Sequence, residues 1–154
     1  MEAEQAQALA ELIDEIVWRF GGHGLDGRCC EDISYVEYRA LRALAQASAC
    51  NMQDLARQLG FTKSGTTRVV DRLERKAYVR RERTAKDRRV CCVTLTAAGR
   101  ALVERVSRER ATRTQAAGAR LGEHMQAVLV VSLKAFLGAL NEGRPLDVVD
   151  IGNS

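Results

Sequence analysis

Hydrophobic positions recur at helical spacing near both ends of the chain. Between residues 4 and 20 an apolar side chain returns every three or four positions, which predicts a first helix. A glycine-rich break follows over about residues 21–32. A broad apolar stripe predicts a sixth helix; it comprises Leu121, Met125, Val128, Leu129, Leu133, Phe136, Leu137 and Leu140. Residues 143–154 are expected to form a loose tail.

The middle of the chain carries helix-capping signals. Ser34 with Glu37 three positions later is a capping box and predicts a second helix that fades near Ser48. Asn51 is expected to cap a short third helix that ends at Gly60. Thr62 is then expected to cap a fourth helix that runs through about Lys76. Two short helices separated by a glycine have the spacing of a helix-turn-helix.

The periodicity then changes from helical to alternating. Residues 78–83 and 90–95 predict two strands, with a charged turn over residues 84–89 between them. Thr96 is expected to cap a long fifth helix. The pattern as a whole predicts a mainly α-helical protein with a small β element.

Charge is concentrated in the predicted helix-turn-helix and strands. The chain has 154 residues, enough for one domain or a small domain plus a pairing arm, and a net charge of +4. Residues 63–89 carry 11 basic and 4 acidic side chains, whereas the first 38 residues carry 9 acidic and 2 basic ones. A basic block on an otherwise slightly acidic chain indicates a polyanionic partner. The alternative is an ordinary solvated charged face.

Several classes of protein are disfavoured by the sequence. No apolar run approaches 18 residues, so no membrane span is expected. The acidic, amphipathic start does not resemble a secretory signal, which favours a cytoplasmic protein. The chain has no HExxH, GxSxG or phosphate-binding glycine loop, so an enzyme is not expected.

The segment from about Ile33 to Leu102 resembles the MarR family of bacterial transcription regulators. ISYVEYRALRAL resembles the family's second helix, NMQDLARQLGFTKSGTTRVVDRLERKAYVRRE its helix-turn-helix and first wing strand, and KDRRVCCVTLTAAG its wing with an Asp-x-Arg element. The resemblance implies a winged helix-turn-helix with a two- to three-stranded wing, in a homodimer. It divides the chain into three parts. Residues 1–32 belong to a dimerisation region, residues 33–96 form a DNA-binding lobe, and residues 97–154 form further dimerisation helices and a tail. Where the family has glycine this chain has Ala77, so we expect a local change at the end of the fourth helix.

The resemblance places DNA contacts in the fourth helix and in the wing. Arg68 lies one turn after Ser64 and is expected to reach guanine, whereas Arg72 and Arg75 are expected to meet phosphates or acidic partners. The resemblance assigns a minor-groove contact to Arg89 and a bracing ion pair to Asp87. The candidate DNA-binding residues are Lys63, Ser64, Thr66, Thr67, Arg68, Arg72, Lys86, Asp87, Arg88 and Arg89.

The family resemblance also implies a small-molecule effector in a crevice between the dimer arm and the DNA-binding lobe. The candidate lining residues are Trp18, His23, Tyr35, Tyr38 and Arg39. A basic residue among aromatic side chains suits an aromatic carboxylate or a phenol. The alternative is that each is an ordinary core or surface residue.

The five cysteines offer a different sensor. Cys29, Cys30, Cys50, Cys91 and Cys92 include two adjacent pairs, which suit oxidants or soft metal ions. The resemblance makes Cys50 a sheet neighbour of Cys91 or Cys92, and Cys29-Cys30 is expected in the loop between the first two helices. Ordinary packing of the cysteines is the alternative. A zinc site of His23, Cys29, Cys30 and His124 is disfavoured because its spacing matches no standard finger.

The function favoured by these observations is that of a dimeric DNA-binding regulator, a repressor released by a small molecule, an oxidant or a soft metal ion. It needs no cofactor, and its partners are double-stranded DNA with a pseudo-palindromic operator and a second copy of the chain. One alternative is a cytosolic thiol-dependent protein that handles metal or redox equivalents. Another is a helical interaction protein with an incidental basic face.

Overall fold

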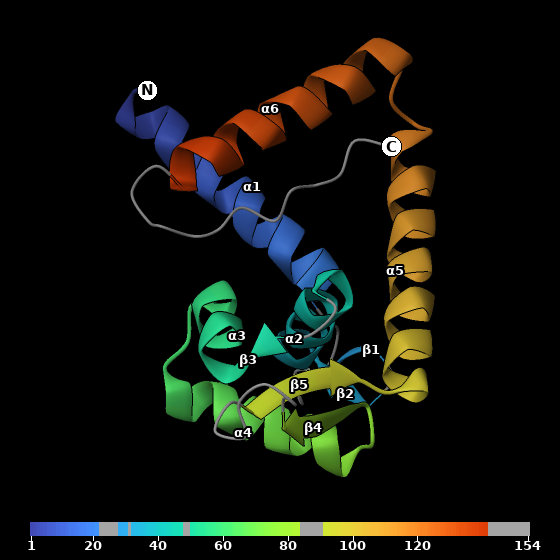
Figure 1. Cartoon of the computed structure of the whole chain (residues 1–154). Helices are drawn as coiled ribbons and strands as arrows, with labels where there is room; N and C mark the ends of the chain where they lie inside the picture. The colour runs from blue at the N-terminus through green and yellow to red at the C-terminus, as the bar shows by residue number, and fades with distance from the viewer. Residues whose placement is uncertain (22–27, 31, 48–49, 84–90, 142–154) are drawn as a thin grey trace.

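The computed structural model describes residues 1–21, 28–30, 32–47, 50–83 and 91–141. Its helices are α1 (Ala3–Gly21), α2 (Tyr35–Gln46), α3 (Met52–Leu59), α4 (Lys63–Arg75), α5 (Ala97–Gly118) and α6 (Glu123–Asn141). Helices α2, α3 and α4 form a lobe with the strands, whereas α1 and α6 lie at the other end of the molecule (Figure 1). Helix α5 runs along one side from the lobe to the level of α6 (Figure 1).

The core lies inside the lobe. Its fully buried side chains come from α2, α3, α4, the strands and the start of α5, and include Ile33, Leu41, Leu55, Val70, Leu73, Val93 and Leu102. These residues recur at three- and four-residue spacing along the helices, as the sequence predicted. Burial of each large apolar side chain stabilises the lobe by roughly 1.5–3 kcal/mol, so the lobe has its own hydrophobic core.

The predicted helix caps are confirmed. The Ser34 hydroxyl accepts from the amide of Glu37 at 3.2 Å, and the Ser34 amide donates to the Glu37 carboxylate at 2.8 Å, which completes the capping box. Asn51 accepts from two amides at the start of α3. The hydroxyls of Thr62 and Thr96 cap α4 and α5 in the same way.

Ala77 ends α4 in a left-handed conformation, with φ of 59°. The Ala77 amide donates to the Glu74 carbonyl at 2.9 Å, and the Tyr78 amide donates to the Leu73 carbonyl at 3.0 Å. This is the hydrogen-bond pattern that glycine normally supports at a helix end. The local change expected at this position is therefore a strained alanine in an otherwise ordinary helix end.

The strands form two small antiparallel sheets. Strand β5 (Cys91–Leu95) lies between β4 (Val79–Arg83) and β3 (Cys50–Asn51) in a three-stranded sheet. A second pair joins β1 (Arg28–Cys30) to β2 (Ile33–Ser34), within a region that the sequence predicted to be a loop. Strands of two or three residues are too short to show an alternating pattern, which explains why the sequence did not predict them.

The first turn of α5 lies directly against the end of α4. The Thr96 amide and hydroxyl donate to the carbonyls of Tyr78 and Ala77, at 3.1 and 2.7 Å. A β-carbon placed on Gly99 would lie 2.0 Å from the Tyr78 carbonyl oxygen. Only glycine therefore permits this approach of α5 to the lobe.

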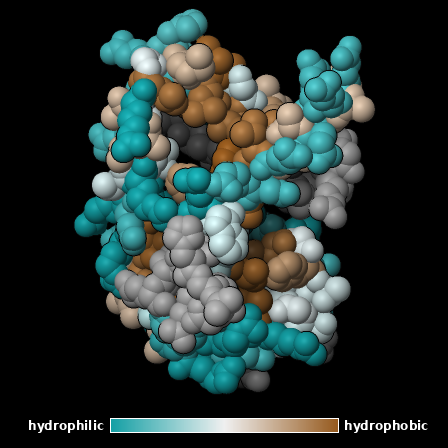
Figure 2. Space-filling view, turned by 180° about the vertical axis from the view of Figure 1, so that it is seen from behind, coloured by the Kyte–Doolittle hydropathy of each residue, from teal (hydrophilic) through white to brown (hydrophobic). Residues whose placement is uncertain are grey.

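Helices α1 and α6 expose most of their apolar side chains in the single chain. The exposed large apolar residues of α6 have exposed fractions from 42% at Val128 to 66% at Val131. Figure 2 shows hydrophobic side chains gathered over the end of the molecule where α1 and α6 lie. Exposed apolar surfaces of this size normally bind another protein chain, a ligand or a membrane.

The expectation that no segment resembles a membrane span was wrong for α6. An 18-residue window, Glu123–Leu140, is long and apolar enough to cross a membrane by length and composition, with a mean hydropathy of 1.3. A single helix of this kind is weak evidence for a span. Pairing of α6 with another helix is a second explanation of its apolar character.

Candidate nucleic-acid interface

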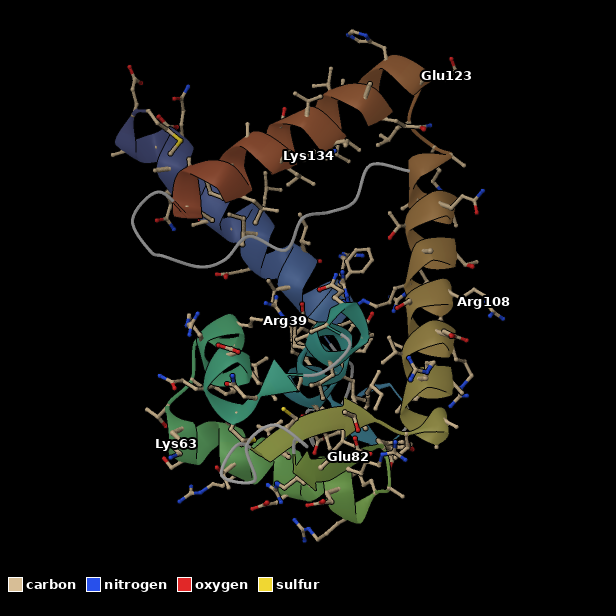
Figure 3. All side chains as sticks on the ribbon, viewed as in Figure 1. Arg39, Lys63, Glu82, Arg108, Glu123 and Lys134 are labelled. Carbon is tan, nitrogen blue, oxygen red and sulfur yellow. The ribbon has the colours of Figure 1, made fainter. Side chains whose placement is uncertain are left out.

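The N-terminal half of α4 presents an exposed cationic face. Lys63, Ser64 and Arg68 are exposed, and with Thr62 and Thr67 they line a shallow open hollow. Lys63 projects from the start of α4, away from the core (Figure 3). Among the residues that the structure describes, neither Lys63 nor Arg68 has an acidic partner. Their charges are therefore available to an outside anion.

Thr66 was predicted to contact DNA, and that prediction was wrong. Its side chain is completely buried, and its hydroxyl donates to the Thr62 carbonyl at 3.0 Å. Positions three and four residues apart share one face of a helix, so Thr66 lies with Val69, Val70 and Leu73 on the inner face. Ser64 and Thr67 remain on the accessible side.

Arg72 was also a candidate for DNA contact, but its partly exposed side chain pairs with the buried carboxylate of Glu37 on α2. Its Nε donates to Oε1 of Glu37 at 2.9 Å, and Nζ of Lys76 lies 3.2 Å from Oε2. This confirms the acidic-partner alternative for Arg72. Burial alone would raise the pKa of Glu37, but the Ser34 amide, Arg72 and Lys76 together lower that pKa below its usual value of 4.5.

A second ion-pair cluster fastens the wing strand to α4. The guanidinium of Arg81 on β4 reaches Asp71 at 2.5 Å and Glu74 at 2.6 Å, both on α4. Arg80 pairs with Glu82 along the same strand. Part of the basic block is therefore neutralised internally, whereas Lys63, Arg68 and Arg75 are exposed without an acidic partner among the described residues.

The predicted wing tip lies outside the described residues. This applies to Lys86, Asp87, Arg88 and Arg89. The strands on either side of it are paired antiparallel, with Arg83 opposite Cys91. The predicted pair of wing strands is therefore confirmed, and the contacts of its tip stay predictions.

Only some of the predicted effector residues lie together. Tyr35 and Tyr38 are neighbours, with ring centroids 6.5 Å apart. Trp18 is 68% exposed, Arg39 is exposed, and His23 lies outside the described residues. The role of Arg39 as the basic residue beside the aromatic rings stays a prediction.

Arg110, which the sequence did not single out, lies over both tyrosine rings. Its guanidinium carbon lies 5.2 Å from the Tyr35 ring centroid and 5.3 Å from that of Tyr38. It also donates to the Phe20 carbonyl at 2.8 Å and so joins α1, α2 and α5. The sequence contained no indication of this contact, because α5 carries several arginines and nothing in the pattern distinguishes Arg110 from the others.

The cysteines are only partly brought together. Strand β3 pairs with β5 as the resemblance implied, but Cys50 lies opposite Val93, and Cys92 lies opposite Asn51. Cys92 is a free thiol of intermediate exposure. Cys29 and Cys30 lie in β1 and not in a loop, and His124 lies on α6 at the far end of the molecule from β1 (Figure 1). No group of three potential metal ligands occurs among the described residues.

Comparison with known proteins shows that the lobe is similar to a family of transcription regulators. Residues 31–90 match the model of the MarR family. The chain is 29% identical over 70 residues to the HTH-type transcriptional regulator YwhA of Bacillus subtilis, covering 46% of this chain and 50% of that protein. It is 27% identical over 110 residues to YdgJ of the same organism, covering 70% and 63%. The chain thus spans about half the length of the curated relatives that it matches, between 41% and 63% for three of them.

Solved structures show the same fold over nearly the whole chain. FabT of Streptococcus pneumoniae, solved in complex with DNA, superposes with a TM-score of 0.77 at 22% identity, covering 92% of this chain and 98% of that one. BpsR of Bordetella bronchiseptica, whose DNA binding is regulated by 6-hydroxynicotinic acid, superposes with a TM-score of 0.64 at 23% identity, covering 84% and 98%. The fold is that of a winged helix-turn-helix protein with additional helices, and the resemblance of this chain to the MarR family is confirmed.

Proposed function

We propose that the chain is a dimeric, sequence-specific DNA-binding transcription regulator in the cytoplasm, with α4 as its recognition helix. The observation that carries the proposal is the exposed face at the start of α4, where Lys63 and Arg68 have no acidic partner among the described residues. A helix of this size fits the major groove, and an arginine on such a face reads guanine O6 and N7. The structure of FabT with DNA supports the same use of the shared fold.

The dimer in this proposal forms through α1, α5 and α6. The exposed apolar residues of α1 and α6, among them Leu12, Trp18, Val131 and Leu140, are too many to leave in water. A two-fold axis would bury the same surface on both chains and would place two copies of α4 for a pseudo-palindromic site. Helix pairing also accounts for the apolar composition of α6 without a membrane.

The wing supplies the second contact in this proposal. Lys86, Arg88 and Arg89 would carry positive charge into a minor groove flanking the site, and Asp87 would brace Arg89. Narrow A·T-rich minor grooves attract arginine through their enhanced negative potential. The wing is therefore expected to read the shape of the flanking DNA.

The proposed regulation is release of a repressor by an aromatic carboxylate or a phenol. Tyr35, Tyr38 and Arg110 lie where α1, α2 and α5 meet. A ligand that engaged Arg110 would compete with its bond to the Phe20 carbonyl and so alter the junction between α1 and the lobe. The regulation of BpsR by 6-hydroxynicotinic acid supports this class of ligand. An oxidant or a soft metal ion acting at Cys92 and its sheet neighbours is the alternative trigger.

The test is an electrophoretic mobility shift with purified protein and genomic fragments. The wild type is expected to retain a discrete subset of fragments in the presence of excess random DNA. Arg68→Ala should weaken binding to those fragments by about 1–3 kcal/mol and relax the sequence preference. The matched control is Arg108→Ala, since Arg108 projects outward from α5 (Figure 3) and carries the same charge. Retention of no fragment above random DNA would contradict the proposal.

A further inference from the structure

A buried carboxylate joins α2 to the far end of α4. Glu37 is 3% exposed, yet its two oxygens accept from three groups: the Ser34 amide at 2.8 Å, Nε of Arg72 at 2.9 Å and Nζ of Lys76 at 3.2 Å. Arg72 and Lys76 are 35 and 39 residues away in sequence. A buried charge is stable only with partners of this kind, so Glu37 holds both cations firmly.

The neighbouring contacts strengthen the same connection. Nζ of Lys76 also donates to the backbone carbonyl of Asp32, and the Tyr78 hydroxyl donates to the Asp32 carboxylate at 3.0 Å. The end of α4 and the turn that follows it are therefore fastened to the N-terminus of α2. The start of α4 has no such fastening among the described residues.

Four of the cations on or next to α4 fall into two classes, whereas Arg75, exposed at the end of the helix, donates among the described residues only to the Asp71 carbonyl and belongs to neither. Lys63 and Arg68 face outward without acidic partners among the described residues, whereas Arg72, 43% exposed, and Lys76 are directed to Glu37. A cation that neutralises a DNA phosphate raises affinity for every sequence equally and steepens the salt dependence. Removing Arg72 and Lys76 from that role leaves binding more dependent on the groups that contact base edges.

We propose that Glu37 is a positioning residue that raises sequence specificity by holding Arg72 and Lys76 in ion pairs with its buried carboxylate. With Glu37 charged, α4 meets the DNA through its N-terminal half, and the sequence-independent share of the affinity stays low. The inference rests on the proposed DNA-binding function.

The test compares two probes. One is a duplex recovered from a randomised pool by selection with the wild-type protein, and the other is the unselected pool. Glu37→Gln keeps the shape of the side chain and an oxygen for the Ser34 amide, but it releases the two cations. Affinity for the unselected pool should rise about tenfold, and its salt slope should steepen by about 1–2, because each added phosphate contact contributes roughly 0.9. The ratio of the affinities for the two probes should fall.

Two further variants separate this effect from net charge and from damage to the fold. Glu104→Gln removes the same charge from an exposed position on α5 and should leave the affinity ratio at the wild-type value. Adding Arg72→Gln to Glu37→Gln should remove about half of the added salt slope. Arg72→Gln alone should leave the salt slope on the unselected pool unchanged, because Arg72 does not contact phosphate in this account.

The outcomes distinguish the two proposals. If the wild type enriches no duplex, the DNA-binding function fails, and the inference fails with it. If the wild type enriches a duplex but Glu37→Gln behaves like Glu104→Gln, only the inference is overturned. If Glu37→Gln does not fold, Arg72→Gln decides: an unchanged salt slope supports the inference, and a slope shallower by about 1 overturns it.

Discussion

Ala77 shows how a single residue departs from the pattern of the family that the chain resembles without loss of the fold. Its φ of 59° lies in the left-handed region, which is unfavourable for alanine by about 1 kcal/mol or more. The hydrogen bonds from Ala77 and Tyr78 to the last turn of α4 hold it there. The strain lies between α4 and β4, so it bears on the stability of the fold.

Replacing Ala77 with glycine should therefore stabilise the protein. We expect Ala77→Gly to raise the free energy of unfolding by about 1 kcal/mol, because glycine adopts this conformation without a steric penalty. Thermal unfolding followed by circular dichroism measures the change. Ala101→Gly is the control, since Ala101 lies exposed within α5, and there glycine should lower the unfolding free energy by about 1 kcal/mol. A lower melting temperature for Ala77→Gly would contradict the assignment of strain.

Glu37 makes stability sensitive to acid. Its pKa is lowered in the folded state, so the carboxylate stabilises the fold fully above the ordinary value of about 4.5, and this contribution is lost as the pH falls through the folded-state pKa. The free energy of unfolding of the wild type should therefore drop below about pH 4.5. Denaturant titrations at several pH values should show a shallower drop for Glu37→Gln. Parallel curves for the two proteins would contradict this role of the carboxylate.

At the scale of elements, the contact between α5 and the lobe depends on Gly99. A methyl group at this position would collide with the backbone of Tyr78, and backbone cannot yield as a flexible side chain can. We expect Gly99→Ala to destabilise the protein by about 1–3 kcal/mol in denaturant titrations. Gly118→Ala is the matched control, because a β-carbon there meets nothing within 4 Å, and it should be neutral or stabilising. Equal stability of the two variants would show that α5 does not approach the lobe this closely.

The sequence predicted the elements whose signals are local. Ser34, Asn51, Thr62 and Thr96 marked the starts of four helices, because a capping hydroxyl or amide acts within three residues of itself. The short strands β1 and β2 were not predicted, since two or three residues carry no periodicity. The exposed cationic face of α4 followed from the helical pattern and the resemblance together.

What the sequence did not predict depends on contacts between distant residues. The pairing of Arg72 with Glu37, and the position of Arg110 over two tyrosine rings, join residues that are far apart in the chain. Arginine on a charged helix gives no signal of which partner it meets. Thr66 was misassigned for a related reason: a small polar residue on a helix can face either way, and here its hydroxyl bonds to its own backbone.

At the scale of the whole molecule, the exposed apolar surface of α1 and α6 predicts self-association. Light scattering should give a mass of about twice 17.0 kDa at micromolar concentration. Val131→Lys adds a charge on the exposed face of α6 and should shift the protein towards monomer, because a charge within an apolar interface is strongly unfavourable. Lys63→Glu changes charge in the lobe, away from α1 and α6, and serves as the control that should leave the mass unchanged. A stable wild-type monomer would contradict the proposed dimer through α1, α5 and α6.

The central claim is that two copies of α4, held by one dimer, read two half-sites of a single DNA duplex. The most direct test is native mass spectrometry of the protein with the duplex recovered by selection with the wild-type protein. The account predicts that a complex of two chains with one duplex dominates the spectrum. It predicts that this complex disappears when one of the two half-sites in the duplex has been scrambled. A dominant complex of one chain with one duplex, or equal binding to the scrambled duplex, would contradict it.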